Sequence, residues 1–155
     1  MFLWEYSRLF MKVTESVRQT ILNYKETQSR NKIVFHKDLL DGIDSLNAGY
    51  VLSSELKKII DDKRVSLKGK TIIERILRSS IVIHPDYGNI LALDNIGILL
   101  EPELKLDFIS FLEEYSKDNI LFIRWSGHIE NDLLWFLSKD HGMKISIENL
   151  SYIII

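Results

Sequence analysis

The sequence has no cysteine, and only 7 glycines and 2 prolines among its 155 residues. The absence of cysteine excludes disulfides, thiolate zinc sites, iron–sulfur clusters and cysteine nucleophiles, and it is typical of a reducing cytoplasm. Scarce glycine disfavours the glycine-rich loops that bind phosphate. Because the net charge is −2, the chain has no overall basic field that would indicate nucleic-acid or anionic-membrane binding.

Long hydrophobic runs are also missing. No apolar stretch approaches the roughly 20 residues that span a bilayer. The apolar residues 1–10 are interrupted by Glu5 and Arg8, and no small-residue cleavage site follows them. We therefore expect a soluble, cytoplasmic protein without a membrane partner, and its length fits one domain with a sizeable core.

The N-terminal segment, residues 1–30, is expected to form an amphipathic helix over 2–29. Apolar residues recur there at three- and four-residue spacing, from Tyr6 to Tyr24. This pattern favours a helix packed on the core. A partner-binding helix is the alternative, because Trp4 and its apolar neighbours widen the hydrophobic face at the front end.

Residues 31–155 are expected to form a single three-layer α/β domain with a mostly parallel sheet. Continuous apolar runs are typical of strands that are buried on both faces, and helical patterns separate them. Strands are predicted at 32–36, 50–52, 89–94, 120–123, 144–147 and 152–155. Helices are predicted at 39–46, 53–60, 71–79, 102–116 and 133–137.

Two strand ends carry residues that suit nucleotide chemistry. In open α/β sheets, ligands bind outside the carboxyl ends of the strands. Asp94 follows one apolar strand, as does the acid that holds Mg²⁺ in P-loop nucleotide hydrolases, and Ser126 follows the next strand, where such proteins often place a polar residue facing the γ-phosphate. Asp94 equally suits a structural role, since aspartate also caps helices.

The phosphate-binding loop of such enzymes is not found. Gly69-Lys70-Thr71 matches the end of the G-x-x-x-x-G-K-[ST] pattern, but Arg64 replaces its first glycine and no strand precedes it. The loop 36–42 has one glycine, Gly42, and two carboxylates, and only Lys37 offers a charge to phosphate. We therefore expect no conventional ATP hydrolysis and no catalytic residue, while ATP and Mg²⁺ binding at the strand ends stays open.

Two other kinds of surface are candidates for binding. The segment 57–78 is locally basic, although three acids dilute it, so it is either a solvated surface or a contact for a nucleic-acid backbone. Its candidate contacts are Lys57, Lys58, Lys63, Arg64, Lys68 and Lys70. Three tryptophans are candidate anchors of a protein interface: Trp4, Trp125 and Trp135. The histidines have no metal-ligand spacing, so no metal site is expected.

The stretch from Asn89 to Gly127 resembles a known family. The resemblance lies in Leu93-Asp94-Asn95-Ile96, in Ile98-Leu99 followed by an acid and Pro102, in Leu104-Lys105-Leu106-Asp107, and in Trp125-Ser126-Gly127. These motifs are similar to those of BrxF, the small P-loop protein of type 3 BREX phage-defence systems. The resemblance implies a P-loop nucleoside-triphosphatase fold in a bacterial anti-phage gene cluster, with Asp94 as the Walker B acid and Ser126 as a sensor-like position. The family's glycine-rich loop is not matched after Phe35.

Three functional hypotheses follow from these observations. The first is a non-catalytic, P-loop-like subunit of an anti-phage defence complex that acts by binding other subunits. The second is an ATP-binding or ATP-hydrolysing defence ATPase with an unorthodox phosphate loop, involving Asp94 and either Lys37 or Lys70. The third is a nucleic-acid-binding adaptor that uses the segment 57–78. The mismatched phosphate loop favours the first hypothesis.

Overall fold

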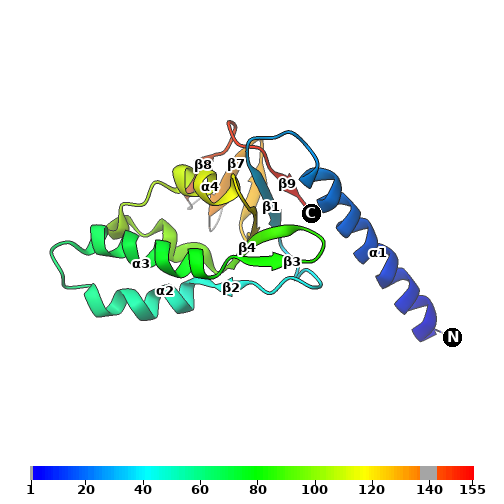
Figure 1. The fold of residues 1–155 in the computed structure, drawn as a ribbon, viewed down its shortest axis with the longest axis horizontal. Helices are drawn as coiled ribbons and strands as arrows, with labels where there is room; N and C mark the ends of the chain where they lie inside the picture. The colour runs from blue at the N-terminus through cyan, green and yellow to red at the C-terminus, as the bar shows by residue number, and fades with distance from the viewer. Residues whose placement is uncertain (1, 137–142) are drawn as a thin grey trace.

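A mostly parallel six-stranded sheet forms the centre of the protein (Figure 1). The computed structural model describes residues 2–136 and 143–155, with side chains from Thr14 onward. The strand order is β2-β4-β5-β1-β9, and the additional strand β3 pairs antiparallel with β4. The strands are β1 (Lys32–His36), β2 (Leu46–Asn47), β3 (Val82–His84), β4 (Gly88–Asp94), β5 (Ile120–Arg124) and β9 (Ile153–Ile154).

The three central strands β1, β4 and β5 coincide with the apolar runs of the sequence, so these strand predictions are confirmed. Successive side chains of a strand point to opposite faces of the sheet. Ile33 and Phe35 belong to the core on one face, whereas Val34 belongs to the core on the other. Burial on both faces explains why these strands lack the alternation of polar and apolar residues.

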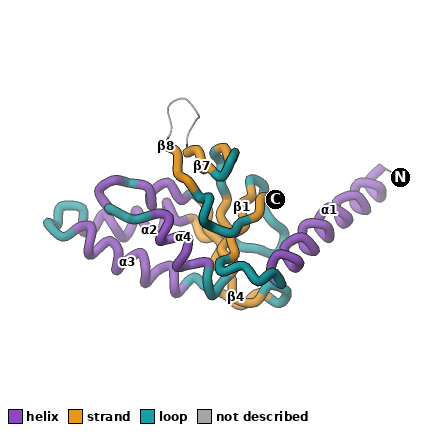
Figure 2. The backbone as a smooth tube through the Cα atoms, turned by 90° about the horizontal axis from the view of Figure 1, so that it is seen from above, coloured by secondary structure: helices purple, strands orange, loops and turns teal. Residues whose placement is uncertain are grey.

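Helices cover both faces of the sheet, which gives three layers (Figure 1). Helices α2 (Ala48–Leu56), α3 (Val65–Ser79) and α4 (Phe108–Ser116) cover one face. Helix α1 (Phe2–Lys25) packs on the other face through Ile21 and Tyr24. The N-terminal half of α1 projects from the body of the protein in both views (Figure 2). None of the described helices has both the length and the apolar character that crossing a membrane requires.

The segment between β1 and α3 differs from the sequence prediction. No helix forms at 39–46, and the predicted strand at 50–52 is part of α2. The Asn47 side chain accepts a hydrogen bond from the backbone N–H of Tyr50 at 3.0 Å, which starts α2 at Ala48, five residues before the predicted helix. Burial of Ala48, Leu52 and Leu56 at four-residue spacing then outweighs the β preference of tyrosine and valine.

The chain from β4 to β5 is also less regular than predicted. Two short 3₁₀ turns, Ile96–Leu100 and Pro102–Leu104, follow β4, and Pro102 begins the second of them. A third such turn, Lys57–Ile59, lies elsewhere in the chain, after α2. Helix α4 begins only at Phe108, where the Asp107 carboxylate accepts a hydrogen bond from the backbone N–H of Ser110 at 3.1 Å. The predicted single helix over 102–116 is therefore wrong in its first half.

A second, antiparallel sheet connects β5 to β9. It comprises β6 (His128–Glu130), β7 (Leu133–Phe136) and β8 (Met143–Ser146), in the order β6-β7-β8. The predicted helix at 133–137 is wrong, because its described part forms β7, and Leu137 lies outside the described residues. Leu134 is fully buried in the main core, so the second sheet extends the same layer as α2, α3 and α4.

The burial of β5 allows a test of this arrangement. Leu121 is 0% exposed at the centre of β5, so we expect Leu121→Ala to lower the free energy of unfolding by about 2–5 kcal/mol, through lost burial and a cavity. Ile83 on β3 is 83% exposed, so Ile83→Ala should change it by no more than about 0.5 kcal/mol. Urea denaturation followed by circular dichroism measures both, and similar losses in the two variants would contradict the assignment of β5 to the core.

Candidate functional site

The topology of the sheet indicates where a ligand would bind. From β1 the chain leads to β2 at one side of the sheet, whereas from β5 it leads past β1 to β9 at the other side. In α/β folds, binding crevices form outside the carboxyl ends of strands where connections diverge in this way. A cleft of about 450 Å³ lies at this edge, and we call it the carboxyl-edge cleft. Lys37, Asp94 and Ser126 all line it, so the three nucleotide-site candidates lie together.

Asp94, the candidate magnesium ligand, is already paired. Its carboxylate accepts a hydrogen bond from Nη1 of Arg124 at 3.3 Å and another from the backbone N–H of Asn95 at 2.8 Å. The Nε of Arg124 donates to the carbonyl oxygen of Lys37 at 2.8 Å. The guanidinium group thus connects the end of β4 with the loop after β1, and a metal ion at Asp94 would lie beside this positive charge.

The sheet register explains this pairing. His36 lies opposite Arg124 on neighbouring strands, and Asn47 lies opposite Asp94. The last residues of β2, β4, β5 and β1 therefore form one row across the carboxyl edge, which we call the terminal row: Asn47, Asp94, Arg124 and His36. The amide of Asn95 donates to the Asn47 side chain at 3.0 Å, so the cap of α2 is tied to the same row.

The loop after β1 cannot hold phosphate in the manner of a P-loop. Residues 37–45 form no helix, so no helix N-terminus faces the cleft from this strand. Gly42 is the one glycine of the loop, and its positive φ of 75° serves a turn between Asp41 and Ile43. Lys37 is exposed and supplies a positive charge at the rim of the cleft.

The remaining wall of the cleft is aromatic. Trp125 is 2% exposed, and its ring packs on Phe136 with centroids 6.0 Å apart, so it belongs to the core rather than to a free surface. Its Nε1 has no hydrogen-bond partner among the described residues. A Cβ at Gly127 would overlap the Trp135 carbonyl, so only glycine fits this turn. Ser126 is exposed beside it.

The other two candidate anchors differ from Trp125. Trp135 on β7 is half-buried, and the Nζ of Lys144 lies 5.7 Å from its ring centroid. The side chain of Trp4 lies outside the described side chains, so its role as an anchor stays a prediction.

The basic residues lie along the end of α2 and the start of α3: Lys57 and Lys58 in the turn after α2, Lys63 and Arg64 before α3, and Lys68 and Lys70 within α3. Lys58 is paired with Glu55 at 3.0 Å, and Lys68 is paired with Asp62. The other four candidates are exposed: Lys57, Lys63, Arg64 and Lys70. Gly69-Lys70-Thr71 lies inside α3, where Gly69 packs against Leu104, so this sequence forms no loop.

His36 is the buried titratable group of the terminal row. It is 3% exposed, and burial lowers the pKa of its imidazole below the ordinary value, against the effect of the hydrogen bond to the Asp38 carbonyl. Nearby Arg124 also lowers this pKa, whereas Asp94 and Asp38 raise it. Among the described residues, no three histidine or carboxylate side chains gather in a way that could hold a metal ion.

The cleft combines groups that can bind a ligand with an acid that is already ion-paired. It presents an exposed lysine, an exposed hydroxyl group and an apolar aromatic wall, while its acid is occupied by a guanidinium group. Sequence reasoning missed Arg124 and the side chain of Asn95, both of which line the cleft. Arg124 had a usable signal, because it ends an apolar strand in the same way as Asp94 does.

No family model matches the chain, and no curated protein or solved structure matches it significantly. The resemblance of residues 89–127 to BrxF therefore stays a prediction from the sequence.

The state of His36 predicts how stability depends on pH. The unfolded chain takes up a proton near pH 6.5, whereas buried His36 does so only at lower pH, so the unfolded state binds more protons in between. We expect the free energy of unfolding to fall as the pH is lowered from about 7 to 5, by at most about 1.4 kcal/mol per pH unit.

Urea denaturation at several pH values measures this slope. His36→Phe removes the titrating group and should flatten it, whereas Ile83→Ala, at an exposed position on β3, changes no titratable group and should leave it unchanged. An identical slope in His36→Phe and the unaltered protein would contradict the prediction.

Proposed function

We propose that this protein is a non-catalytic, P-loop-like subunit of a bacterial defence complex, and that it acts by binding other subunits at the carboxyl-edge cleft. The observation that carries the proposal is the ion pair of Asp94 with Arg124, 3.3 Å apart. In P-loop nucleotide hydrolases the corresponding acid serves Mg²⁺ and the phosphate loop binds the β- and γ-phosphates. Here the acid is occupied by a side chain, and the loop after β1 has neither a helix nor a set of glycines.

The layout of the sheet supports a P-loop-like origin. The acid-bearing strand β4 lies next to β5, and β5 lies next to β1, so residues after all three strands meet in one cleft. The resemblance of residues 89–127 to BrxF assigns the Walker B and sensor-like positions to Asp94 and Ser126, and both line that cleft. Membership of an anti-phage complex rests on this resemblance.

Protein binding suits the chemistry of the cleft. The partly exposed ring of Phe136, together with the exposed Lys37, can hold an apolar side chain and an acidic neighbour of a partner chain, since aromatic contacts and rim charges are typical of interfaces. Lys37 at the rim would mainly steer association with an acidic partner surface.

The first test concerns the absence of nucleotide chemistry. Isothermal titration with ATP and Mg²⁺ should give no heat of binding, and a coupled phosphate-release assay should give no turnover above buffer. The physical reason is that Arg124 occupies Asp94 and that the loop after β1 lacks a phosphate cradle. Micromolar affinity together with turnover that Asp94→Ala abolishes would contradict the proposal and support the ATPase alternative.

The second test concerns the partner. The protein is co-expressed with the products of its neighbouring genes, and the affinity for each co-purifying subunit is measured by biolayer interferometry. Lys37→Glu reverses the charge at the cleft and should weaken binding about tenfold or more. Lys63→Glu makes the same change at an exposed position on the α2–α3 connection and should have little effect. Equal losses in both variants, or a loss with Lys63→Glu alone, would refute binding at the cleft.

A further inference from the structure

A second cavity lies on the α1 face of the sheet, and we call it the α1 cavity. It has a volume of about 430 Å³, within the range of small-molecule sites, and it shares no lining residue with the carboxyl-edge cleft. Helix α1, the loop 37–45 and the β3–β4 hairpin enclose it. Its walls are largely apolar and include Val17, Ile21, Leu40, Ile43 and Tyr87.

His36 carries an unused hydrogen-bond acceptor, which is buried in the wall of this cavity. Val34 belongs to the core on the α1 face, so His36, two residues later on β1, points to the same face and lines the cavity. Its Nδ1 lies 2.8 Å from the carbonyl oxygen of Asp38. Because a carbonyl only accepts hydrogen bonds, Nδ1 carries the proton and Nε2 is left with a lone pair. Nε2 is buried and has no partner among the described residues.

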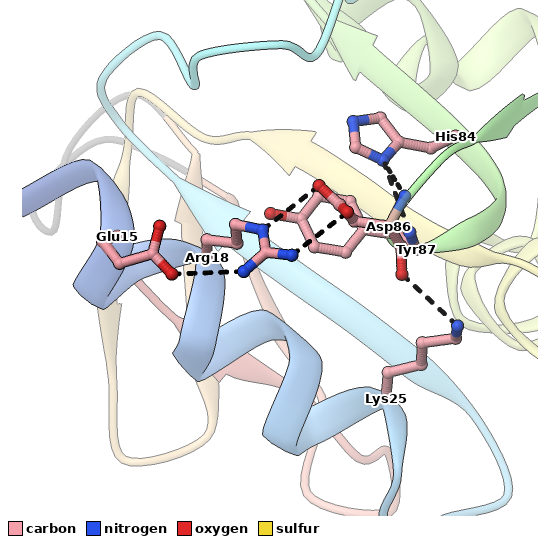
Figure 3. A network of polar contacts seen from close by, with 6 residues as sticks. All are labelled: Glu15, Arg18, Lys25, His84, Asp86 and Tyr87. Atoms are coloured by element: carbon pink, nitrogen blue, oxygen red, sulfur yellow. Dashed lines mark hydrogen bonds and ion pairs between the residues drawn. The ribbon is translucent and has the colours of Figure 1, made fainter. Parts of the chain in front are cut away.

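The polar contacts at the mouth hold the walls in place (Figure 3). Arg18 on α1 donates to Asp86 on the hairpin through Nε and Nη2, each at 3.2 Å. The backbone N–H of Asp86 donates to Nδ1 of His84 at 3.1 Å, and the His84 ring stacks on Tyr87 with centroids 4.4 Å apart. The hairpin and α1 therefore form one fixed side of the cavity.

The charges at the mouth select against anions. Arg18 is neutralised by Asp86, while Asp38 and Asp41 line the same cavity without an ion pair to a described residue. Phosphates and carboxylates would meet these two negative charges, whereas neutral and cationic compounds would not. A compound with an apolar ring and an N–H donor would fit both the apolar walls of the α1 cavity and the unpaired Nε2 of His36.

We propose that the α1 cavity binds a small, neutral or cationic heteroaromatic compound whose N–H donates a hydrogen bond to Nε2 of His36. Because Nε2 has almost no exposed surface, the ligand has to displace part of the wall to reach it. The segment 39–42 is the part that can yield, since it has no regular structure and Leu39 is 74% exposed rather than anchored in the core. Movement of this segment spares the Asp38 carbonyl that keeps the proton on Nδ1.

Indole and 1-methylindole test this proposal, because they share an aromatic body and differ in the N–H donor. With histidine labelled by ¹⁵N in the full chain, we expect indole to shift the Nε2 resonance of His36 upfield, and 1-methylindole not to do so. Indole should also bind about fivefold more tightly or better, as one hydrogen bond to a buried acceptor allows. Inorganic phosphate should cause no shift at His36.

Two variants separate the donor contact from general apolar binding. His36→Phe keeps an aromatic ring but removes the acceptor, so it should bring the affinities for indole and 1-methylindole together. His128→Phe makes the same change at an exposed position on β6 and should preserve the difference. The resonance of the unaltered protein tests the proposal even if His36→Phe does not fold.

Equal affinities for the two compounds in the unaltered protein would overturn the proposal, because they would mean that Nε2 accepts no hydrogen bond from the N–H of indole. A shift of the His36 resonance by inorganic phosphate would also overturn it, because the cavity would then accept an anion. Neither result depends on the carboxyl-edge cleft, so failure here is distinguishable from failure of the proposed subunit function.

Discussion

The contact between Arg124 and Asp94 determines what the carboxyl edge of this sheet can hold. Both side chains are about one-third exposed, and such pairs contribute only about 0–1 kcal/mol to stability, so the importance of this one is geometric. Its guanidinium group reaches the acid at the end of β4 and the Lys37 carbonyl after β1 at the same time. A cation built into the sheet thus occupies the place where a metal-dependent site needs a free carboxylate.

The loop 37–45 belongs to the same arrangement. β2 is only two residues long and pairs with the very end of β4, through Leu46 and Leu93. The loop therefore crosses from β1 over β5 and β4 to the far side, a distance of about 14 Å at the usual strand spacing. Nine residues cover this distance, but they leave little chain for a helix whose N-terminus could point at a phosphate. The short connection from β1 to β2 therefore explains why no helix follows β1 in the place where a phosphate-binding helix would begin.

Elements that a local sequence pattern determines could be predicted, whereas elements that depend on contacts between distant parts of the chain could not. β1, β4 and β5 were predictable because burial on both faces demands a continuous apolar run, which is visible in the sequence. β7 was not, because Leu133, Leu134 and Phe136 fit a short helix as well as a strand, and pairing with β6 and β8 decides between them. For α2, the signal was present in the spacing of Ala48, Leu52 and Leu56, but Tyr50 and Val51 concealed it.

The residues of the candidate site divide in the same way, into those that a local pattern identifies and those whose position depends on distant contacts. Asp94, Ser126 and Lys37 were predictable as strand-end residues, since parallel strands end at one edge of a sheet. The partner of Asp94 was not, because the pairing of Arg124 depends on the register between β4 and β5. Register is set by non-local contacts, and a shift of one residue would turn Arg124 to the other face. The burial of Trp125 likewise depends on the second sheet, of which the sequence pattern indicated only the strand at 144–147.

The two faces of the sheet are covered by different numbers of helices, and this difference accounts for the α1 cavity. One helix is about 10 Å wide, whereas five strands extend over about 19 Å, so α1 alone cannot cover its face of the sheet. Three helices, α2, α3 and α4, cover the opposite face. On the α1 face, the loop 37–45 and the β3–β4 hairpin have to complete the cover, and the cavity lies where these segments meet α1. His36 turns to this face two residues after Val34, as Arg124 does after Phe122 and Asp94 after Ala92, so an unsatisfied acceptor and an incompletely filled layer coincide at one place.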